Sequence, residues 1–104
     1  MLLLNIDYVP GREIAEALGI VKGTTVQSKN FGRDFMAGMK TLVGGEIVGY
    51  TEMLTEARQI ATKRMVDEAE RLNADAVINV RFSSSSIMQG AAEVVAYGTA
   101  VKLA

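Results

Sequence analysis

Two groups of charged residues in this sequence have the type and spacing that chemistry requires. Arg33 and Asp34 stand side by side at the expected start of a short helix. A guanidinium, together with backbone N–H groups at a helix start, can bind an anion. In the alternative interpretation, Asp34 stabilises the helix N-terminus and Arg33 pairs with a charge across a subunit boundary. The alternative needs no ligand and is the preferred one.

The second group lies on a longer expected helix. Glu52 and Glu56 are four residues apart, so their carboxylates lie on one side of that helix, and Arg58 follows nearby. Such a pair can bind a hard cation or act as acid and base. A solvated helix face explains the same pattern, and we prefer it. The candidate ligand-binding residues are therefore Arg33, Asp34, Glu52 and Arg58.

The residue types that are missing exclude several chemistries. The 104 residues include no cysteine and no histidine. A disulfide, a thiol nucleophile, a thiolate zinc site and an imidazole base or metal ligand are therefore excluded. We expect no catalytic residue, no metal ligand and no cofactor. With 11 basic and 12 acidic residues, the net charge is −1, and we expect no nucleic-acid partner.

Methionine is the one soft ligand that the sequence offers. Met36, Met39, Met53 and Met65 could bind Cu(I) through their thioether sulfurs. All four fall on apolar helical stripes, however, and methionine fills irregular gaps in cores and interfaces. We interpret them as packing residues.

The first half of the chain predicts short elements. Alternation over 2–7 predicts a strand, the apolar face of 12–18 predicts a short helix that ends at Gly19, and β-branched residues over 20–27 predict a second strand. Lys22-Gly23 within that strand indicates a bulge or a close backbone approach. An apolar stripe over 35–43 predicts a helix, capped by Asn30 and stopped by Gly44-Gly45.

The second half predicts the longest element. A continuous apolar stripe over 50–72, with charges opposite, predicts a long amphipathic helix. The charged face holds pairs of opposite sign four residues apart: Lys63 with Asp67, Arg64 with Glu68 and Asp67 with Arg71. Residues 76–82 and 94–103 predict two strands, joined through a loop or hairpin over 83–90 that includes the run Ser83–Ser86. Strands joined in this way are antiparallel. We expect one domain over 1–104, of the two-layer α+β class, with a small antiparallel sheet packed against the long helix.

A small open sheet leaves unpaired edges, and unpaired edges favour association with another copy. The apolar content of 49% is consistent with additional surface that is buried between copies. We therefore expect a closed homo-oligomer.

Several segments together resemble the YbjQ-like family of small bacterial and archaeal proteins. They are Leu18-Gly19-Ile20-Val21-Lys22-Gly23, Arg33-Asp34-Phe35-Met36-Ala37-Gly38-Met39, Val43-Gly44-Gly45, Tyr50-Thr51-Glu52-Met53-Leu54, Glu56-Ala57-Arg58, Ala74-Asp75-Ala76-Val77 and Gly98-Thr99-Ala100-Val101. The resemblance covers nearly the whole chain. It implies a dodecin-like α+β subunit, a ring-shaped homopentamer and a family label of heavy-metal binding. The sequence departs from that label, because soft metals favour thiolate and imidazole ligands.

We therefore expect a non-catalytic homo-oligomeric module that binds a small ligand or ion between its subunits. The alternatives are a metal-binding protein, as the family label says, and an enzyme that uses Arg33, Asp34, Glu52 and Arg58 at subunit boundaries. No leader or membrane-spanning run is visible, so a cytoplasmic protein without a membrane partner is expected.

Overall fold

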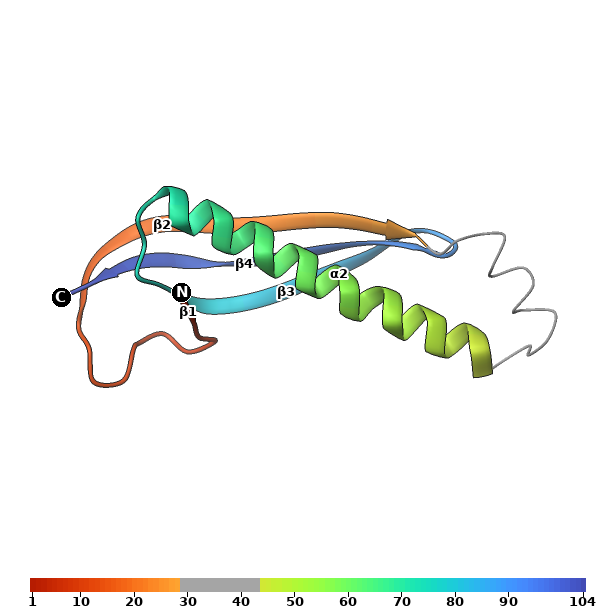
Figure 1. Ribbon diagram of the computed structural model, residues 1–104, viewed down its shortest axis with the longest axis horizontal. Coiled ribbons are helices and arrows are strands. Elements are labelled where there is room, and N and C mark those ends of the chain that lie inside the picture. Colours follow the sequence, from red (N-terminus) through yellow and green to blue (C-terminus); the bar gives the residue numbers. More distant parts are fainter. Residues whose placement is uncertain (29–43) are drawn as a thin grey trace.

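The structure is a computed structural model, and it describes residues 1–28 and 44–104. Its elements follow the order β1 (Leu2–Leu3), β2 (Ile14–Ser28), α2 (Gly44–Arg71), β3 (Ala76–Met88) and β4 (Ala91–Leu103). Figure 1 shows two layers, with α2 running obliquely across one face of the sheet. The two-layer α+β class is thereby confirmed.

The sheet contains four strands in the order β1-β3-β4-β2. β4 is paired antiparallel to β2 on one side and to β3 on the other, and β3 and β4 form the expected hairpin. β1 pairs parallel with the start of β3, at Leu2 with Ala76 and Leu3 with Val77. The sheet is therefore mixed, and the expectation of a purely antiparallel sheet is wrong at this one short strand.

The core lies between α2 and the sheet. Every fourth residue of α2 from 57 to 69 is fully buried, and three of these four side chains are small: Ala57, Ala61, Met65 and Ala69. They pack on one face of β2, β3 and β4, where Val21, Val77, Val94, Ala96 and Ala100 are buried. A stripe of alanines lets the helix axis lie close to the sheet. Gly23 completes this approach, since a Cβ there would lie 2.8 Å from the Cβ of Arg64 and closer still to the helix backbone.

The opposite face of the sheet, here called the open face, is covered by the described residues only at one end. The N-terminal segment folds over that end, where Val9 packs with Ala76, Ile78 and Val101. Farther along, the open face carries the exposed side chains Ile20, Val26 and Tyr97. The sheet is thus covered by α2 on one side and is largely exposed on the other.

Three expectations about the strands need correction. The short helix over 12–18 is wrong, because Ile14–Leu18 belong to β2 and pair with the end of β4. Gly19 does not end a helix. It has φ +114 beside an irregularity in that pairing, a conformation that glycine adopts without penalty. The expected first strand over 2–7 is only Leu2–Leu3, and its remainder is irregular chain.

The serine run is also strand rather than loop. Ser83, Ser84, Ser85 and Ser86 all pair with β4, and the turn is confined to Gln89 and Gly90. The pairing partner supplies the order that serine itself does not favour.

The long helix is confirmed, and it extends from Gly44 to Arg71, starting earlier than its apolar stripe predicted. Gly44 and Gly45 lie at its beginning. The helix over 35–43 and its cap at Asn30 fall outside the described residues. None of the helices in the described ranges is long and apolar enough to cross a membrane.

Candidate functional site

The charged residues singled out from the sequence are not gathered into one site by the described part of the chain. Arg33 and Asp34 lie outside the described residues. Glu52 and Arg58 are both exposed on α2. Six residues at about 100° each separate them by roughly 120° around the helix axis. The Nη2 of Arg58 donates to the Oγ1 of Thr55 at 3.3 Å, within its own helix.

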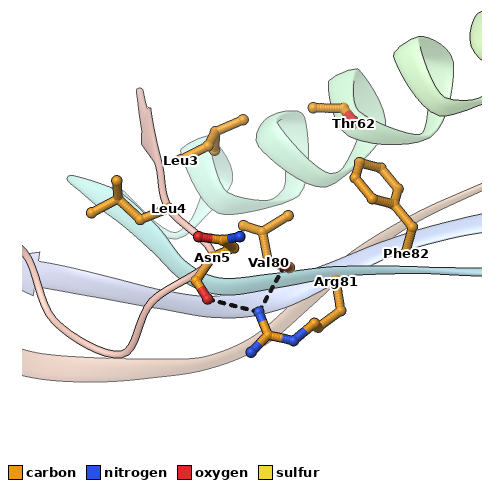
Figure 2. Close-up of a pocket in the computed structure, with 7 residues that line it drawn as sticks. All are labelled: Leu3, Leu4, Asn5, Thr62, Val80, Arg81 and Phe82. Carbon is orange, nitrogen blue, oxygen red and sulfur yellow. Dashed lines mark hydrogen bonds between the residues drawn. The ribbon is translucent and has the colours of Figure 1, made fainter.

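The larger described pocket lies elsewhere, where the N-terminal segment, α2 and β3 meet (Figure 2). We call it the edge pocket. Its volume is about 710 Å³, and its lining residues are Leu3, Leu4, Asn5, Thr62, Val80, Arg81 and Phe82. Leu3 and Val80 pack against the core, whereas Phe82 is 49% exposed. The pocket is therefore an apolar hollow that opens beside an exposed aromatic ring.

Arg81 turns away from this hollow. Figure 2 shows its side chain on the side of β3 opposite to Phe82, as the alternation of a strand requires. Its Nη1 donates to the carbonyl oxygens of Asn5 at 2.8 Å and Val80 at 3.0 Å. These bonds tie the N-terminal segment to β3 and fix the guanidinium on the open face.

The outer edge of β3 is covered along only part of its length. Leu4 and Ile6 bond to its first half: the amide of Val80 donates to Leu4 and that of Asn79 to Ile6. Alternate residues of a strand direct their N–H and C=O groups to the same edge. Following Val80, the backbone groups of Phe82, Ser84 and Ser86 therefore point outward, and no described residue bonds to them.

The outer edge of β2 is covered in its middle by side chains of α2. The backbone N–H of Lys22 donates to the Oε1 of Glu68 at 3.3 Å. The Nη1 of Arg64 donates to the carbonyl oxygen of Thr24 at 2.7 Å. By the same alternation, the backbone groups of Val26 and Ser28 also point outward, and these have no such cover among the described residues.

The uncovered parts of both edges lie at the same level of the sheet. Val26 is opposite Glu93 of β4, and Glu93 is opposite Ser85 of β3. The described residues thus cover the outer edge of β3 toward the end where the N-terminal segment lies and the outer edge of β2 in its middle, and they leave both edges uncovered toward the β3–β4 turn. Exposed apolar side chains accompany this open end, with Val26 57% exposed and Met88 60% exposed.

The described residues do not suit a soft metal. No group of three or more acidic side chains that could hold a metal ion occurs among them, and the whole sequence lacks cysteine and histidine. Met53 and Met65 are buried residues of α2, as the packing interpretation predicts, whereas Met36 and Met39 fall outside the described residues. The side chains of the described residues therefore do not fit a soft heavy metal.

The architecture defines a small two-layer α+β domain with partly uncovered edges on both sides of its sheet. A solved structure has the same fold: a protein of unknown function of the DUF74 family from Pediococcus pentosaceus, with a TM-score of 0.60 and 17% identity. The match covers 100% of this chain and 98% of that one.

The chain belongs to the family of UPF0145 proteins. The YbjQ family model, described as "Putative heavy-metal-binding", matches residues 1–104, which confirms the resemblance seen in the sequence. The UPF0145 protein of Clostridium novyi is 62% identical over 103 residues, covering 99% of both chains. That of Thermotoga maritima is also 62% identical over 103 residues, covering 99% of this chain and 97% of its own. The family is uncharacterised.

Sequence reasoning did not find the edge pocket. Its lining comes from three segments that are far apart in the chain, and leucine, valine and phenylalanine there have the appearance of ordinary core residues. Arg81 carried the only available signal, since it is a lone cation in an apolar strand. That signal could not show that Arg81 holds the backbone of Asn5.

Proposed function

We propose that this protein is a non-catalytic homo-oligomeric module. Copies form a closed ring by pairing the open part of β3 with the open part of β2 on the next copy. Small ligands are held between subunits, at the edge pocket that flanks this junction. Five copies are the expected number, as the family resemblance implies. The carrying observation is that both uncovered edges lie at one level of the sheet.

The level of the two edges matters because of symmetry. Rotation about a ring axis moves each copy around without shifting it along the axis. When the strands run roughly along that axis, only segments at the same level can meet. β2 and β3 both run antiparallel to β4, so they share one direction and would pair in parallel between copies. Such a heterologous contact gives a ring when its rotation closes and a filament when it does not, whereas a self-complementary contact gives dimers.

The side chains beside these edges support the same assembly. Phe82 and Met88 are exposed side chains of β3, and the apolar edge pocket lies next to Phe82. Pairing with another copy would remove part of this apolar surface from water, at roughly 25 cal/mol per Å². The serines of β3 leave room for a neighbouring strand.

Proline substitution tests the pairing without changing the fold. Proline is tolerated on an edge strand where its missing N–H would face solvent. Ser84→Pro removes one outward donor from β3, and Val26→Pro removes one from β2. Each variant alone should run as a monomer in native mass spectrometry, because every β3–β2 contact between its copies lacks one donor. The matched controls Ser84→Ala and Val26→Ala retain the N–H and should assemble like the unmodified protein.

Mixing the two proline variants distinguishes a ring from other assemblies. Each variant retains one intact edge, so a mixture of Ser84→Pro and Val26→Pro should form mixed dimers. If both variants still form complete rings, or if the unmodified protein is a monomer, the proposed pairing is wrong. Dimers lost only with Ser84→Pro would indicate a self-complementary contact through β3 instead. The same spectra reveal any stoichiometric bound ligand as additional mass.

A further inference from the structure

One row of side chains crosses the open face in a pattern that the edge-pairing proposal does not use. Lys22 of β2 is opposite Tyr97 of β4, and Tyr97 is opposite Arg81 of β3. Their chain neighbours Val21, Ala96 and Phe82 face α2 or the edge pocket, so all three side chains of the row lie on the open face. An aromatic ring is thus flanked by a cation on each neighbouring strand.

The row is available to a ligand. Tyr97 is 39% exposed, and Lys22 and Arg81 are both exposed. The side chains of Lys22 and Tyr97 make no hydrogen bond or ion pair with any described residue. Both hydrogen bonds of the Arg81 side chain to the described chain leave from Nη1, so its Nη2 and Nε remain for an anion.

The surroundings favour a flat, negatively charged ligand. The next row along the sheet is Thr24, Val95 and Ser83, and its short side chains leave the face of Tyr97 uncrowded. The carboxylate of Glu93 is four residues away along β4, about 13 Å from Tyr97. The carboxylate of Glu68 accepts from the backbone N–H of Lys22 at the outer edge of β2, so the row carries two cations, Lys22 and Arg81, beside one carboxylate, and its excess positive charge lies on the Arg81 side.

From this geometry we infer a binding site for a flat aromatic ring that carries a phosphate, such as a mononucleotide. The ring stacks on Tyr97, since a base offers a π face to an aromatic side chain on a sheet surface. The phosphate is held by Lys22 or Arg81, of which the guanidinium offers paired donors and is already positioned by Asn5 and Val80. The site is complete within one chain and does not depend on the proposed ring.

Calorimetric titration with AMP tests the inference, with adenosine and inorganic phosphate as separate probes of the two halves. AMP should bind with a Kd of about 1 mM or below, and at least tenfold more tightly than either probe. Binding should weaken as salt is added, because the phosphate contact is exposed.

Substitutions locate the site. Tyr97→Leu should weaken AMP binding about tenfold or more and leave the weak binding of phosphate unchanged. Lys22→Gln and Arg81→Gln combined should abolish the salt dependence. Lys63→Gln, which removes a cation from the outer side of α2, should have no effect.

Two results would overturn the inference: no measurable heat with AMP, or binding that Tyr97→Leu leaves intact. Repeating the titration on Ser84→Pro separates the two proposals. If that variant is monomeric and binds AMP normally, the site belongs to the single chain. If AMP binds although the protein never forms rings, the inference holds and the proposed assembly fails.

Discussion

Replacing Gly23 by alanine gives the sharpest test of how α2 lies on the sheet. No positive φ occurs at Gly23, and in such a position glycine-to-alanine changes stabilise proteins by about 0.4–1 kcal/mol through the unfolded chain. The packing predicts the opposite sign. A Cβ at Gly23 would clash with the carbonyl oxygen of Ala61 and the backbone nitrogen of Met65, and would lie 2.8 Å from the Cβ of Arg64.

The size of the destabilisation depends on which atoms the new Cβ at Gly23 would clash with. Two of the three atoms are helix backbone, which cannot rotate away as the end of a side chain could. The helix must therefore move away from the sheet where its buried alanine stripe packs. Overpacking of this kind costs typically 1–3 kcal/mol. After the gain through the unfolded chain is subtracted from a mid-range cost, a net loss of about 1–1.5 kcal/mol remains, and it lowers Tm by roughly 4–12 °C for a domain of this size.

Thermal unfolding followed by circular dichroism, at one fixed protein concentration, measures this loss. Thr24→Ala on the same strand is the control, because its exposed side chain should contribute no more than about 0.5 kcal/mol. A Gly23→Ala variant as stable as the unmodified protein, or more stable, would show that α2 does not approach β2 as closely as described.

Two further substitutions separate core packing from surface charge. Met65→Ala should destabilise the protein by about 2–5 kcal/mol in urea unfolding, because Met65 is fully buried and its removal leaves a cavity; a loss below 1 kcal/mol would contradict this core. Lys63→Ala should change the free energy of unfolding by less than about 0.5 kcal/mol, since its 3.2 Å ion pair with Asp67 joins exposed side chains. A larger change, especially one that persists in high salt, would show that the ion pair contributes more to the free energy of unfolding than an exposed pair should.

The sequence predicted the elements whose patterns are long and local. The stripe of α2 is unambiguous because Ala57, Ala61, Met65 and Ala69 recur at helical spacing over several turns. The pairing of Lys63 with Asp67 was likewise predicted from spacing alone. The expected pair of Arg64 with Glu68 differs, since both side chains bond instead to the backbone of β2.

The misassigned segments are those whose structure depends on distant partners. The apolar spacing of Ile14, Ala17 and Leu18 fits a helix as well as a strand, and the pairing with β4 decides the outcome. The serine run has low intrinsic strand preference, and it too is ordered by β4. For the candidate site the limit is similar. The row of Lys22, Tyr97 and Arg81 exists only through cross-strand register, which no local pattern reveals.

The two bonds from α2 to the middle of β2 have a consequence for how the chain avoids aggregation. A long strand with exposed backbone groups is a template on which other chains can add and build fibrils. The side chains of Glu68 and Arg64 block part of this edge, because they form hydrogen bonds with the backbone of Lys22 and Thr24. During synthesis, Thr24 is added 40 residues before Arg64, and Lys22 is added 46 residues before Glu68. A polypeptide that ends before Arg64 therefore has β2 without these two contacts, and we expect such a fragment to aggregate more readily than the whole chain.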